Sequence, residues 1–454
     1  MSLLRTIEQK LNLSADSSGP VRGTLSMGRI GMIWLAANLV VTTLLTGTLF
    51  IPSVPLTTAV WLITAGTIIG AVVLVLIGNV GTRTGLPTTA LTRGSFGIRG
   101  SYLPVAANII VLMGWSWVQA MLAGITVDYL VESLTGYSNP ALFSILCETI
   151  VVILAIRGHD GIAKIEPWLA VIMLAIMGWI FYTVFNKFSL AELNSLPAPA
   201  EGALTGGLVL DVVIATAISW TVLSADINRT AKSQKAGIIG SGVGYVLSTI
   251  ISMTLGATVF AYVLLSGTEA IAFDPVTVVS AFGAPLAIVI FFSVMATNTM
   301  AVFGMTTSLV NARAEGNMRF LPAALILGVV SIAGSTFFGL LDRFTNFMMM
   351  IGSFFVPVFA VVIVDYYIIS RCSYTRDILR ATNGRYWYKS GFNPAAIICW
   401  VVGAALSYVL AYVWPSPIGA TIPTFVLTFV LYFALSARRM QKKYHEQEHL
   451  ALSA

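Results

Sequence analysis

The stretch LPVAANIIVLMGWSWVQAMLAGI, residues 103–125, indicates the fold class of the chain. It contains no charged residue and is long enough to cross a lipid bilayer as one helix. Near its centre lie Trp115 and Gln119, which are four residues apart and therefore share one face of a helix. An amide at that depth is costly unless it faces protein or a water-filled cavity. The pair indicates either packing between helices or a ligand site.

The composition of the whole chain points to the same class. Of the 454 residues, 57% are hydrophobic and 10% are charged, and the mean hydropathy is +0.88. These values exclude a soluble globular domain and predict an all-α polytopic membrane protein in contact with lipid. The net charge of +6 could suggest a nucleic-acid partner, but the basic residues are scattered between apolar runs, so we expect none. Three cysteines without paired or metal-ligand spacing predict neither a disulfide framework nor a zinc site.

Apolar runs predict twelve transmembrane helices, because each span needs about 20 such residues. The runs lie near residues 28–50, 56–78, 103–130, 139–157, 163–186, 206–226, 236–266, 284–312, 320–340, 345–370, 393–414 and 418–437. Residues 79–100 are expected to form a structured cytoplasmic loop with short helical turns. Residues 274–283 begin with Asp-Pro, a helix-entry signal, and predict a short extracellular helix. The membrane domain is then 28–437, between an N-terminal segment, 1–27, and a tail, 438–454.

The basic residues predict the orientation of the chain. Twenty-three of the 25 lysines and arginines lie in the N-terminal segment, the tail and alternate loops, whereas the opposite loops hold only Lys187 and Arg343. Basic residues accumulate on the cytoplasmic side of membrane proteins. Both termini are therefore expected in the cytoplasm, which requires an even number of spans. The expected location is a bacterial cytoplasmic membrane.

Three spans carry polar residues at bilayer depth. In the first span, Asn38 is followed by Thr42 and Thr43, which fits an unwound segment and fits an intact helix with a hydrogen-bonded Asn38 equally well. The polar residues that cluster near the centres of the sixth and eighth spans include Thr216, Ser219, Trp220, Thr221, Ser293, Thr297 and Asn298. Hydroxyl and carbonyl oxygens without a carboxylate suit a monovalent cation such as Na⁺. Packing between small polar residues is the alternative.

Glu148 lies near the middle of the fourth span and is the one carboxylate clearly at bilayer depth. Such groups often mark ion or proton paths, but Ala141 and Ser144 on the same helix face offer no countercharge. A role in coupling and a side chain that is simply protonated both stay open. The sequence has no nucleotide loop, zinc-binding helix or Ser-His-Asp arrangement, so an enzyme is not predicted.

One loop motif resembles that of a known family. The run GLPTTALTRGSFGIRGSYLP, residues 85–104, is similar to the signature loop of the nucleobase-cation symporter-1 family, and Gly114-Trp115 follows it at the family spacing. Shorter motifs correspond as well: Ser224-Ala225-Asp226 with Arg229, Ala296-Thr297-Asn298 and Val364-Asp365-Tyr366-Tyr367. The resemblance spans residues 27–439. It implies a leucine-transporter-like fold in which residues 28–186 and 206–370 form two inverted repeats of five helices and residues 393–437 add two more.

The resemblance also implies a substrate site around Trp115, where the family stacks an aromatic ring on a planar heterocycle. Gln119 corresponds to the ligand-binding amide of the hydantoin-type members, whereas cytosine permeases carry their Gln at the position of Leu112. Asn298 corresponds to a substrate-binding Asn of the eighth helix. The remaining implied substrate residues are Asn38, Thr216, Ala217, Ser219 and Trp220. The family places a second stacking aromatic where this chain has Ala217, so Trp220 could replace it.

The implied cation site comprises carbonyls near Ala36 and Leu39 of the first span together with Ser293, Ala296 and Thr297 of the eighth. We therefore expect a cation-coupled symporter that imports a nucleobase or a related planar nitrogen heterocycle by alternating access. Na⁺ is the expected coupling ion and protons are the alternative. An uncoupled channel or a membrane receptor for a similar small molecule is the other hypothesis. Cytosine, purines, hydantoin, allantoin and vitamin precursors all fit, and no obligate protein partner is evident.

Overall fold

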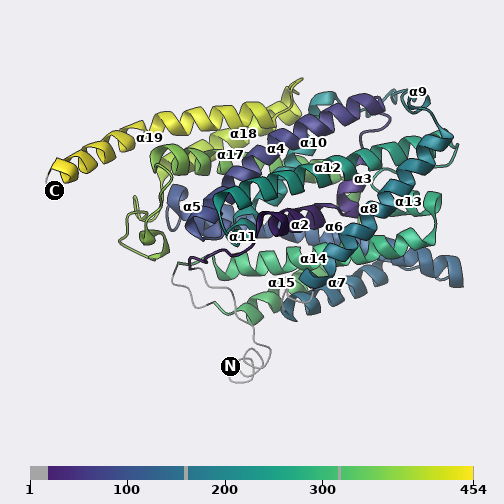
Figure 1. The fold of residues 1–454 in the computed structure, drawn as a ribbon, viewed down its shortest axis with the longest axis horizontal. Helices are drawn as coiled ribbons and strands as arrows, with labels where there is room; N and C mark the ends of the chain where they lie inside the picture. Colours follow the sequence, from purple (N-terminus) through teal and green to yellow (C-terminus); the bar gives the residue numbers. More distant parts are fainter. Residues whose placement is uncertain (1–18, 158–161, 315–317, 453–454) are drawn as a thin grey trace.

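The computed structural model describes residues 19–157, 162–314 and 318–452. The described chain is a bundle of helices, most of which run along the long axis of the molecule (Figure 1). In chain order the helices are α2 (Met27–Asn38), α3 (Val41–Thr48), α4 (Leu56–Thr84), α5 (Thr88–Phe96), α6 (Tyr102–Thr135), α7 (Pro140–Arg157), α8 (Ile162–Lys187), α9 (Leu190–Leu193), α10 (Gly206–Thr221), α11 (Ser224–Asn228), α12 (Gln234–Leu265), α13 (Pro275–Phe282), α14 (Ala284–Val310), α15 (Phe320–Gly334), α16 (Gly339–Asp342), α17 (Phe344–Ile363), η1 (Val364–Ile369), η2 (Arg376–Leu379), α18 (Pro394–Tyr408), η3 (Val409–Val413) and α19 (Thr421–Leu452).

These helices account for the predicted spans. Within the described ranges, eight helices are long and apolar enough to cross a membrane, and α2 with α3 forms one further element that is bent by 53°. Three shorter apolar helices, α10, α15 and the first part of α19, cover the rest of the predicted runs. The all-helical membrane architecture is therefore confirmed. The count of twelve crossings, the domain boundaries and the orientation of the termini stay predictions.

Two of the predicted spans are broken. α2 ends at Asn38 and α3 begins at Val41, with Leu39 (φ −82°, ψ 58°) and the extended Val40 (φ −126°, ψ 160°) between them. The first span is thus unwound rather than an intact helix. The sixth span is broken at Val222–Leu223, between α10 and α11. Neither break contains glycine or proline, so contacts with other helices must stabilise them.

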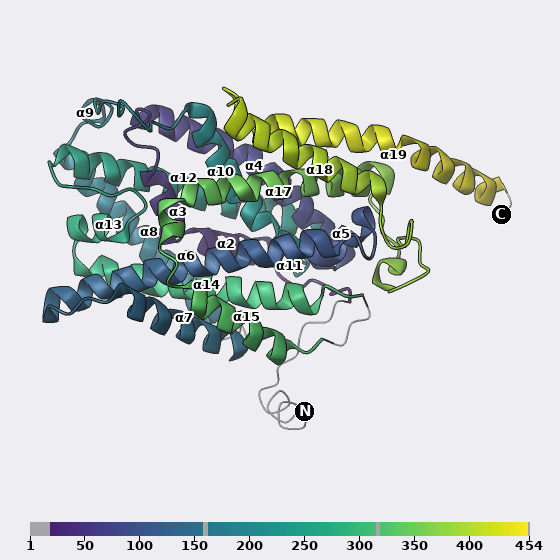
Figure 2. The same cartoon turned by 180° about the vertical axis from the view of Figure 1, so that it is seen from behind.

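The helix α6 lies inside a group of four packed helices, α6, α7, α14 and α15. Figures 1 and 2 show these four side by side from opposite directions. α14 also contacts α3, and α10 contacts α4 and α17. The first broken span therefore lies next to α14, which carries predicted substrate and cation residues, and the second carries predicted substrate residues itself.

The predicted loop between the second and third spans contains the short helix α5, all of whose residues are buried. At its start the Thr88 N–H donates to Asp226 Oδ2 in α11 (3.0 Å). Further along, the Arg93 guanidinium donates to the Asn311 carbonyl at the end of α14. Burial lowers the pKa of this guanidinium to about 10. α5 thus connects α11 with α14 at one end of the bundle.

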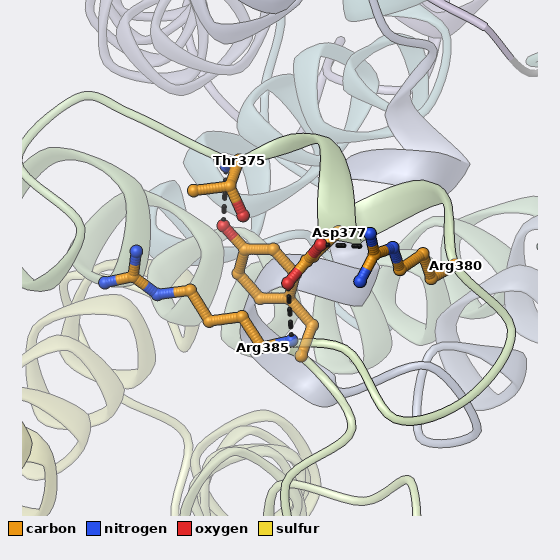
Figure 3. Close-up of polar contacts among 5 residues, drawn as sticks. Thr375, Asp377, Arg380 and Arg385 are labelled. Atoms are coloured by element: carbon orange, nitrogen blue, oxygen red, sulfur yellow. Dashed lines mark hydrogen bonds and ion pairs between the residues drawn. The ribbon is translucent and has the colours of Figure 1, made fainter.

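The loop between η1 and α18 packs over the segment that follows α5. Figure 3 shows how it is folded: Asp377 forms an ion pair with Arg380 (Oδ1 to Nε, 3.3 Å) and accepts from the Arg385 backbone N–H (3.0 Å). Nearby, the Thr375 N–H donates to the hydroxyl of Tyr386 (2.9 Å). Backbone hydrogen bonds join this loop to the residues after α5. The loop therefore holds the segment that follows α5 in place.

Candidate functional site

A small cavity of about 40 Å³ lies where α3, α6, α10 and α14 meet. Its lining residues are Thr42, Thr43, Thr46, Leu112, Trp115, Gln119, Thr216, Ser219, Trp220, Leu223, Thr297 and Ala301. They include Trp115, Gln119, Thr216, Ser219 and Trp220 from the predicted substrate site and Thr297 from the predicted cation site. A cavity of this volume holds roughly three water molecules. A ligand that fits it as it stands must be small.

Packing against α17 fixes the ring of Trp115. The rings of Phe344 and Phe347 meet the indole edge to face, with centroids 5.6 and 5.7 Å from it. Phe347 reaches this position because Gly114 has no side chain, since a Cβ there would lie 2.6 Å from the phenyl ring. Each such aromatic pair contributes about 0.5–1.5 kcal/mol beyond the area that it buries. The indole is therefore held in place before any ligand binds.

Trp115 and Gln119 each keep one polar atom without a partner. Both side chains line the cavity, and the Trp115 Nε1 and the Gln119 Oε1 are buried without a hydrogen bond to any described protein group. A buried donor or acceptor left in this state costs about 1–3 kcal/mol. The indole offers a donor and the amide an acceptor on the same helix face. This face can bind a ligand that carries both kinds of polar group.

Trp220 lines the cavity from α10, and Asn38 holds it there. The Trp220 Nε1–H donates to Asn38 Oδ1 (2.9 Å), and the indole meets Trp34 edge to face at 6.2 Å. Asn38 also accepts from the Thr43 hydroxyl (3.0 Å) and donates to Thr249. Asn38 was predicted to contact substrate, but the structure places it at the α2/α3 break and outside the cavity lining. Its amide positions an aromatic wall and stabilises the break.

Two other predicted substrate residues also lie away from the cavity. Ala217 is fully buried against α4, where its Cβ faces Gly70. The aromatic side chain that α10 contributes to the cavity is therefore Trp220. Asn298 is buried between helices, where its Nδ2 donates to Glu148 Oε2 (2.6 Å) and to the Ser116 carbonyl (3.3 Å). Ala217 and Asn298 therefore both contact neighbouring helices in this structure.

Four of the six hydroxyl groups on the cavity wall donate their protons to carbonyls of their own helices. The donor and acceptor residues are Thr46 and Thr42 (2.8 Å), Thr216 and Val212 (3.1 Å), Ser219 and Thr216 (2.7 Å), and Thr297 and Ser293 (3.1 Å). Serine and threonine commonly bond in this way within helices. A hydroxyl has one proton, so each of these groups offers a ligand only its oxygen lone pairs. The wall of the cavity is consequently rich in acceptors.

The α2/α3 break releases the carbonyls that were predicted to bind the cation. Because Val40 is extended, its N–H does not form the helical bond to the Ala36 carbonyl. The first bond of α3 runs from the Leu44 N–H to the Val40 carbonyl (3.2 Å), so the Leu39 carbonyl lies outside both helices' ladders. Carbonyls freed at such a break can coordinate a cation.

The other predicted cation residues lie on α14, which contacts α3. Thr297 lines the cavity and keeps its lone pairs free, because its proton goes to the Ser293 carbonyl. Ser293 is buried and Ala296 is half-buried. Neutral hydroxyl and carbonyl oxygens are hard ligands that suit a monovalent cation. The donor set therefore fits Na⁺ chemically.

A larger cavity of about 620 Å³ shares Leu223 with the small one. Its wall comes from α2, α11 and α14 and includes Arg29, Asp226 and Arg229. Leu223 stands in the α10/α11 break and packs beside Gly304 of α14. The break thus places one apolar side chain between a small polar site and a wide, charged vestibule.

Six lining residues were not assigned to the substrate or cation site from the sequence: Thr42, Thr43, Thr46, Leu112, Leu223 and Ala301. Thr46 follows Thr42 by four positions, so helical spacing could have placed both on one face. Leu223 and Ala301 carry no such signal, because an apolar residue in an apolar span is typical of packing.

Residues 25–432 match the model of a protein family described as permease for cytosine/purines, uracil, thiamine and allantoin. A putative purine-cytosine permease of Bacillus subtilis is 24% identical, over 92% of this chain and 94% of that protein. A hydantoin permease of Microbacterium maritypicum is 22% identical, over 88% of this chain and 86% of that protein.

Two solved structures of the transporter Mhp1 show the same fold. One is a closed conformation of this nucleobase-cation-symport-1 family transporter with bromovinylhydantoin bound, and it matches with a TM-score of 0.77 at 21% identity over 94% of this chain and 96% of that chain. The other, an inward-facing conformation, matches with a TM-score of 0.79 at 20% identity over 95% and 94%. The fold that the loop motif implied is therefore confirmed.

Proposed function

The chain belongs to the permease family for cytosine, purines, uracil, thiamine and allantoin, and we propose that it is a cation-coupled symporter for a small planar heterocycle rich in ring N–H groups. Members of this family are membrane transporters and not enzymes. In our proposal the small cavity is the substrate site. The larger cavity is the path to the cytoplasm, and alternating access moves the Leu223 barrier between them.

One observation carries the proposal, namely the unpartnered indole N–H of Trp115 and amide oxygen of Gln119 on one cavity wall. A ring that presents a carbonyl to the indole and an N–H to the amide satisfies both groups at once. This removes a cost of about 1–3 kcal/mol for each group. The indole, held in place by α17, supplies a flat surface for stacking, and Trp220 supplies a second aromatic wall.

The acceptor-rich wall favours one chemical class of ring. Ring N–H groups that alternate with carbonyls, as in hydantoin, uracil and the ring of allantoin, can donate to the hydroxyl oxygens of α3, α10 and α14. Cytosine presents an unprotonated ring nitrogen, and the four hydroxyls that donate to carbonyls of their own helices cannot donate to it. Leu112 also lines the cavity, so an apolar group stands where cytosine permeases carry an amide. We therefore propose a lactam or ureide ring rather than cytosine.

The coupling ion in this proposal is Na⁺, bound between the α2/α3 break and α14. The freed carbonyls of Ala36 and Leu39 and the oxygens of Ser293, Ala296 and Thr297 would bind it. Thr297 belongs to both sites, since it also lines the substrate cavity. An ion couples to a substrate only if it binds more tightly to the conformation that the substrate prefers. A residue that contacts both the ion and the substrate can make the affinity for one depend on the binding of the other.

Uptake into proteoliposomes tests the proposal. The reconstituted chain is offered radiolabelled hydantoin, uracil, allantoin or cytosine under an inward Na⁺ gradient, an inward proton gradient or no gradient. We expect concentrative uptake of an N–H-rich ring with the Na⁺ gradient and little uptake of cytosine. Flux that only equilibrates under every gradient would support an uncoupled channel instead. Concentration by the proton gradient alone would reject Na⁺ as the coupling ion.

A thermal-shift measurement checks binding without transport. A ligand that binds the folded state stabilises it and so raises the melting temperature. The stabilisation is about 2.7 kcal/mol when the ligand concentration is about a hundred times Kd. We expect hydantoin to raise the melting temperature more in Na⁺ than in choline. If Trp115→Ala and Gln119→Ala both leave this shift and uptake unchanged, the small cavity is not the substrate site.

A further inference from the structure

Glu148 is a carboxyl group buried among four helices, and the transport mechanism proposed above does not use it. It lies in α7 and its exposed fraction is 0%. Its oxygens accept hydrogen bonds from Ser116 of α6, Asn298 of α14 and Ser331 of α15. These are the four helices that lie side by side in Figures 1 and 2. One carboxyl group therefore joins all of them.

Three oxygen atoms form a triangle of short contacts at this site. Ser116 Oγ is 2.8 Å from Glu148 Oε1, Ser331 Oγ is 2.6 Å from the same Oε1, and the two hydroxyl oxygens are 2.8 Å apart. Each contact needs a proton between its two oxygens, because two lone pairs otherwise face each other at hydrogen-bond distance. The two serines supply one proton each. The third must come from Glu148, so the triangle is complete only when the carboxyl group is protonated.

The amide of Asn298 places this proton on Oε1. Its Nδ2 donates to the Ser116 carbonyl (3.3 Å) and to Glu148 Oε2 (2.6 Å). A carbonyl can only accept, so the NH₂ group must lie on this side and the amide cannot be flipped. Oε2 is therefore an acceptor, and the carboxyl proton lies on Oε1 within the triangle.

The partners that Glu148 meets across the packed helices are neutral. Among the described residues they are the hydroxyls of Ser116 and Ser331 and the amide of Asn298, and the neighbouring titratable side chain is Cys147 of α7 itself. An ionised carboxylate at this depth would have hydrogen-bond donors but no countercharge from them. Charges in such positions are strongly disfavoured in a membrane interior. The absence of a countercharge among these partners therefore also favours a protonated Glu148.

The cluster links the substrate helix to the cation helix. Ser116 directly follows Trp115 in α6, and Asn298 directly follows Thr297 in α14. Trp115 and Thr297 both line the small cavity. A movement of α14 relative to α6 therefore changes the cavity and the Glu148 cluster together.

We infer that Glu148 is a proton-binding site whose proton locks α14 to α6. When the proton leaves Oε1 for water, two protons remain for the three contacts, so one contact is left with two lone pairs facing each other. The carboxylate then carries one uncompensated negative charge, the triangle opens, and α14 is released from α6. Only the role in coupling rests on the proposed transport function, because protonation can be measured without a substrate.

Infrared spectroscopy of the purified full chain tests the protonation directly. A protonated carboxyl group has a carbonyl stretching band that is well separated from the carboxylate bands. We expect the wild-type chain to show such a band at neutral pH that Glu148→Gln lacks. Ser331→Ala should shift the band without removing it, because Ser116 still accepts the proton. The matched control is Glu192→Gln, which removes an exposed carboxylate in the cap of α9 and should leave the band unchanged.

The pH dependence of melting tests the lock. In Glu148→Gln the amide nitrogen can donate to both serines while the amide oxygen accepts from Asn298, so this variant mimics the protonated state permanently. We expect the melting temperature of the wild type to fall as the pH rises from about 5, where the carboxyl group of the unfolded chain is ionised, until Glu148 loses its proton in the folded chain. We expect Glu148→Gln to lack that fall. Glu192→Gln should behave as the wild type does.

The outcomes separate this inference from the proposed function. No acid band at neutral pH, or the same band in Glu148→Gln, would overturn the protonation. Equal slopes of melting temperature against pH in the wild type and Glu148→Gln would overturn the lock, even if hydantoin uptake is found. If no heterocycle is taken up but the band and the slopes differ as expected, the proposed function fails and the proton site stands.

Discussion

Two faces of α6 carry polar side chains at the same depth, and the surroundings of these two faces differ. On one face Trp115 and Gln119 border a cavity, and each keeps a buried polar atom without a protein partner. On the other, Ser116 is bonded to Glu148 and lies against Ser331. A membrane helix can carry polar groups next to a cavity or against other polar groups. α6 does both, one residue apart, so the unpartnered atoms that border the cavity point to a ligand, and the hydrogen bonds of Ser116 point to coupling between helices.

Removing the partner from the bonded face should have the largest effect. Glu148→Ala leaves the donors of Ser116, Asn298 and Ser331 without their acceptor, and each buried unsatisfied group costs about 1–3 kcal/mol. We expect the free energy of unfolding to fall by about 3 kcal/mol or more in total. Thermal unfolding in detergent measures this loss. Glu148→Gln is the control and should lose under about 1 kcal/mol, so equal losses in the two variants would contradict the role of the neutral triangle.

On the cavity face, Trp115→Ala should weaken ligand binding. Stacking of a ring on an aromatic side chain contributes about 1–3 kcal/mol, so we expect Kd to rise by about 30-fold. Titration of the purified variant with the ring that the wild type binds measures this change. Trp117→Ala is the matched control, because Trp117 packs against Gly334 of α15 and does not line the cavity. Similar losses in both variants would mean that the two faces are not distinct.

The amide on the cavity face should contribute less than the ring. Gln119→Ala removes an acceptor for one ring N–H, so we expect about 1 kcal/mol, or about a fivefold rise in Kd. Methylation of the ligand's ring nitrogen should remove the same bond from the other side. The two changes should therefore be non-additive in a double cycle of binding measurements. Additive losses would show that Gln119 acts on another group.

The cavity face of α6 could be predicted from the sequence, because its residues lie on one regular helix. Trp115 and Gln119 are four residues apart in an apolar run, so their shared face follows from helix geometry alone. Helix position and length followed in the same way from apolar runs of sufficient length. The resemblance of the loop at residues 85–104 to the family motif then indicated the arrangement of the helices.

Other parts could not be predicted because they depend on residues far away in the chain. Asn38 has no local feature that ends a helix there, and its partners Thr249 and Trp220 come from α12 and α10. Ala217 was assigned to the cavity by its motif position, but Gly70 of α4 makes room for it on another face.

The hydrogen-bond partners of Glu148 could not be predicted for the same reason. Its neighbours on α7 gave no sign of hydrogen-bond partners, since Ser116, Asn298 and Ser331 belong to three other helices. Local spacing predicts which side chains share a face, and only the packing of helices shows what that face meets.

Trp220→Phe should have the smallest effect and sharpens the comparison on the opposite wall of the cavity. Unlike the Trp115 N–H, the Trp220 N–H is already bonded to Asn38 at the α2/α3 break. Phenylalanine keeps an aromatic wall and removes one neutral hydrogen bond, so we expect a loss of about 0.5–1.5 kcal/mol in unfolding free energy and little change in Kd. Paired measurements of melting and ligand titration separate the two quantities. If Trp220→Phe instead raises Kd as strongly as Trp115→Ala and leaves melting unchanged, the Trp220 N–H binds the ligand, and the break must be stabilised by the remaining bonds of Asn38 to Thr43 and Thr249.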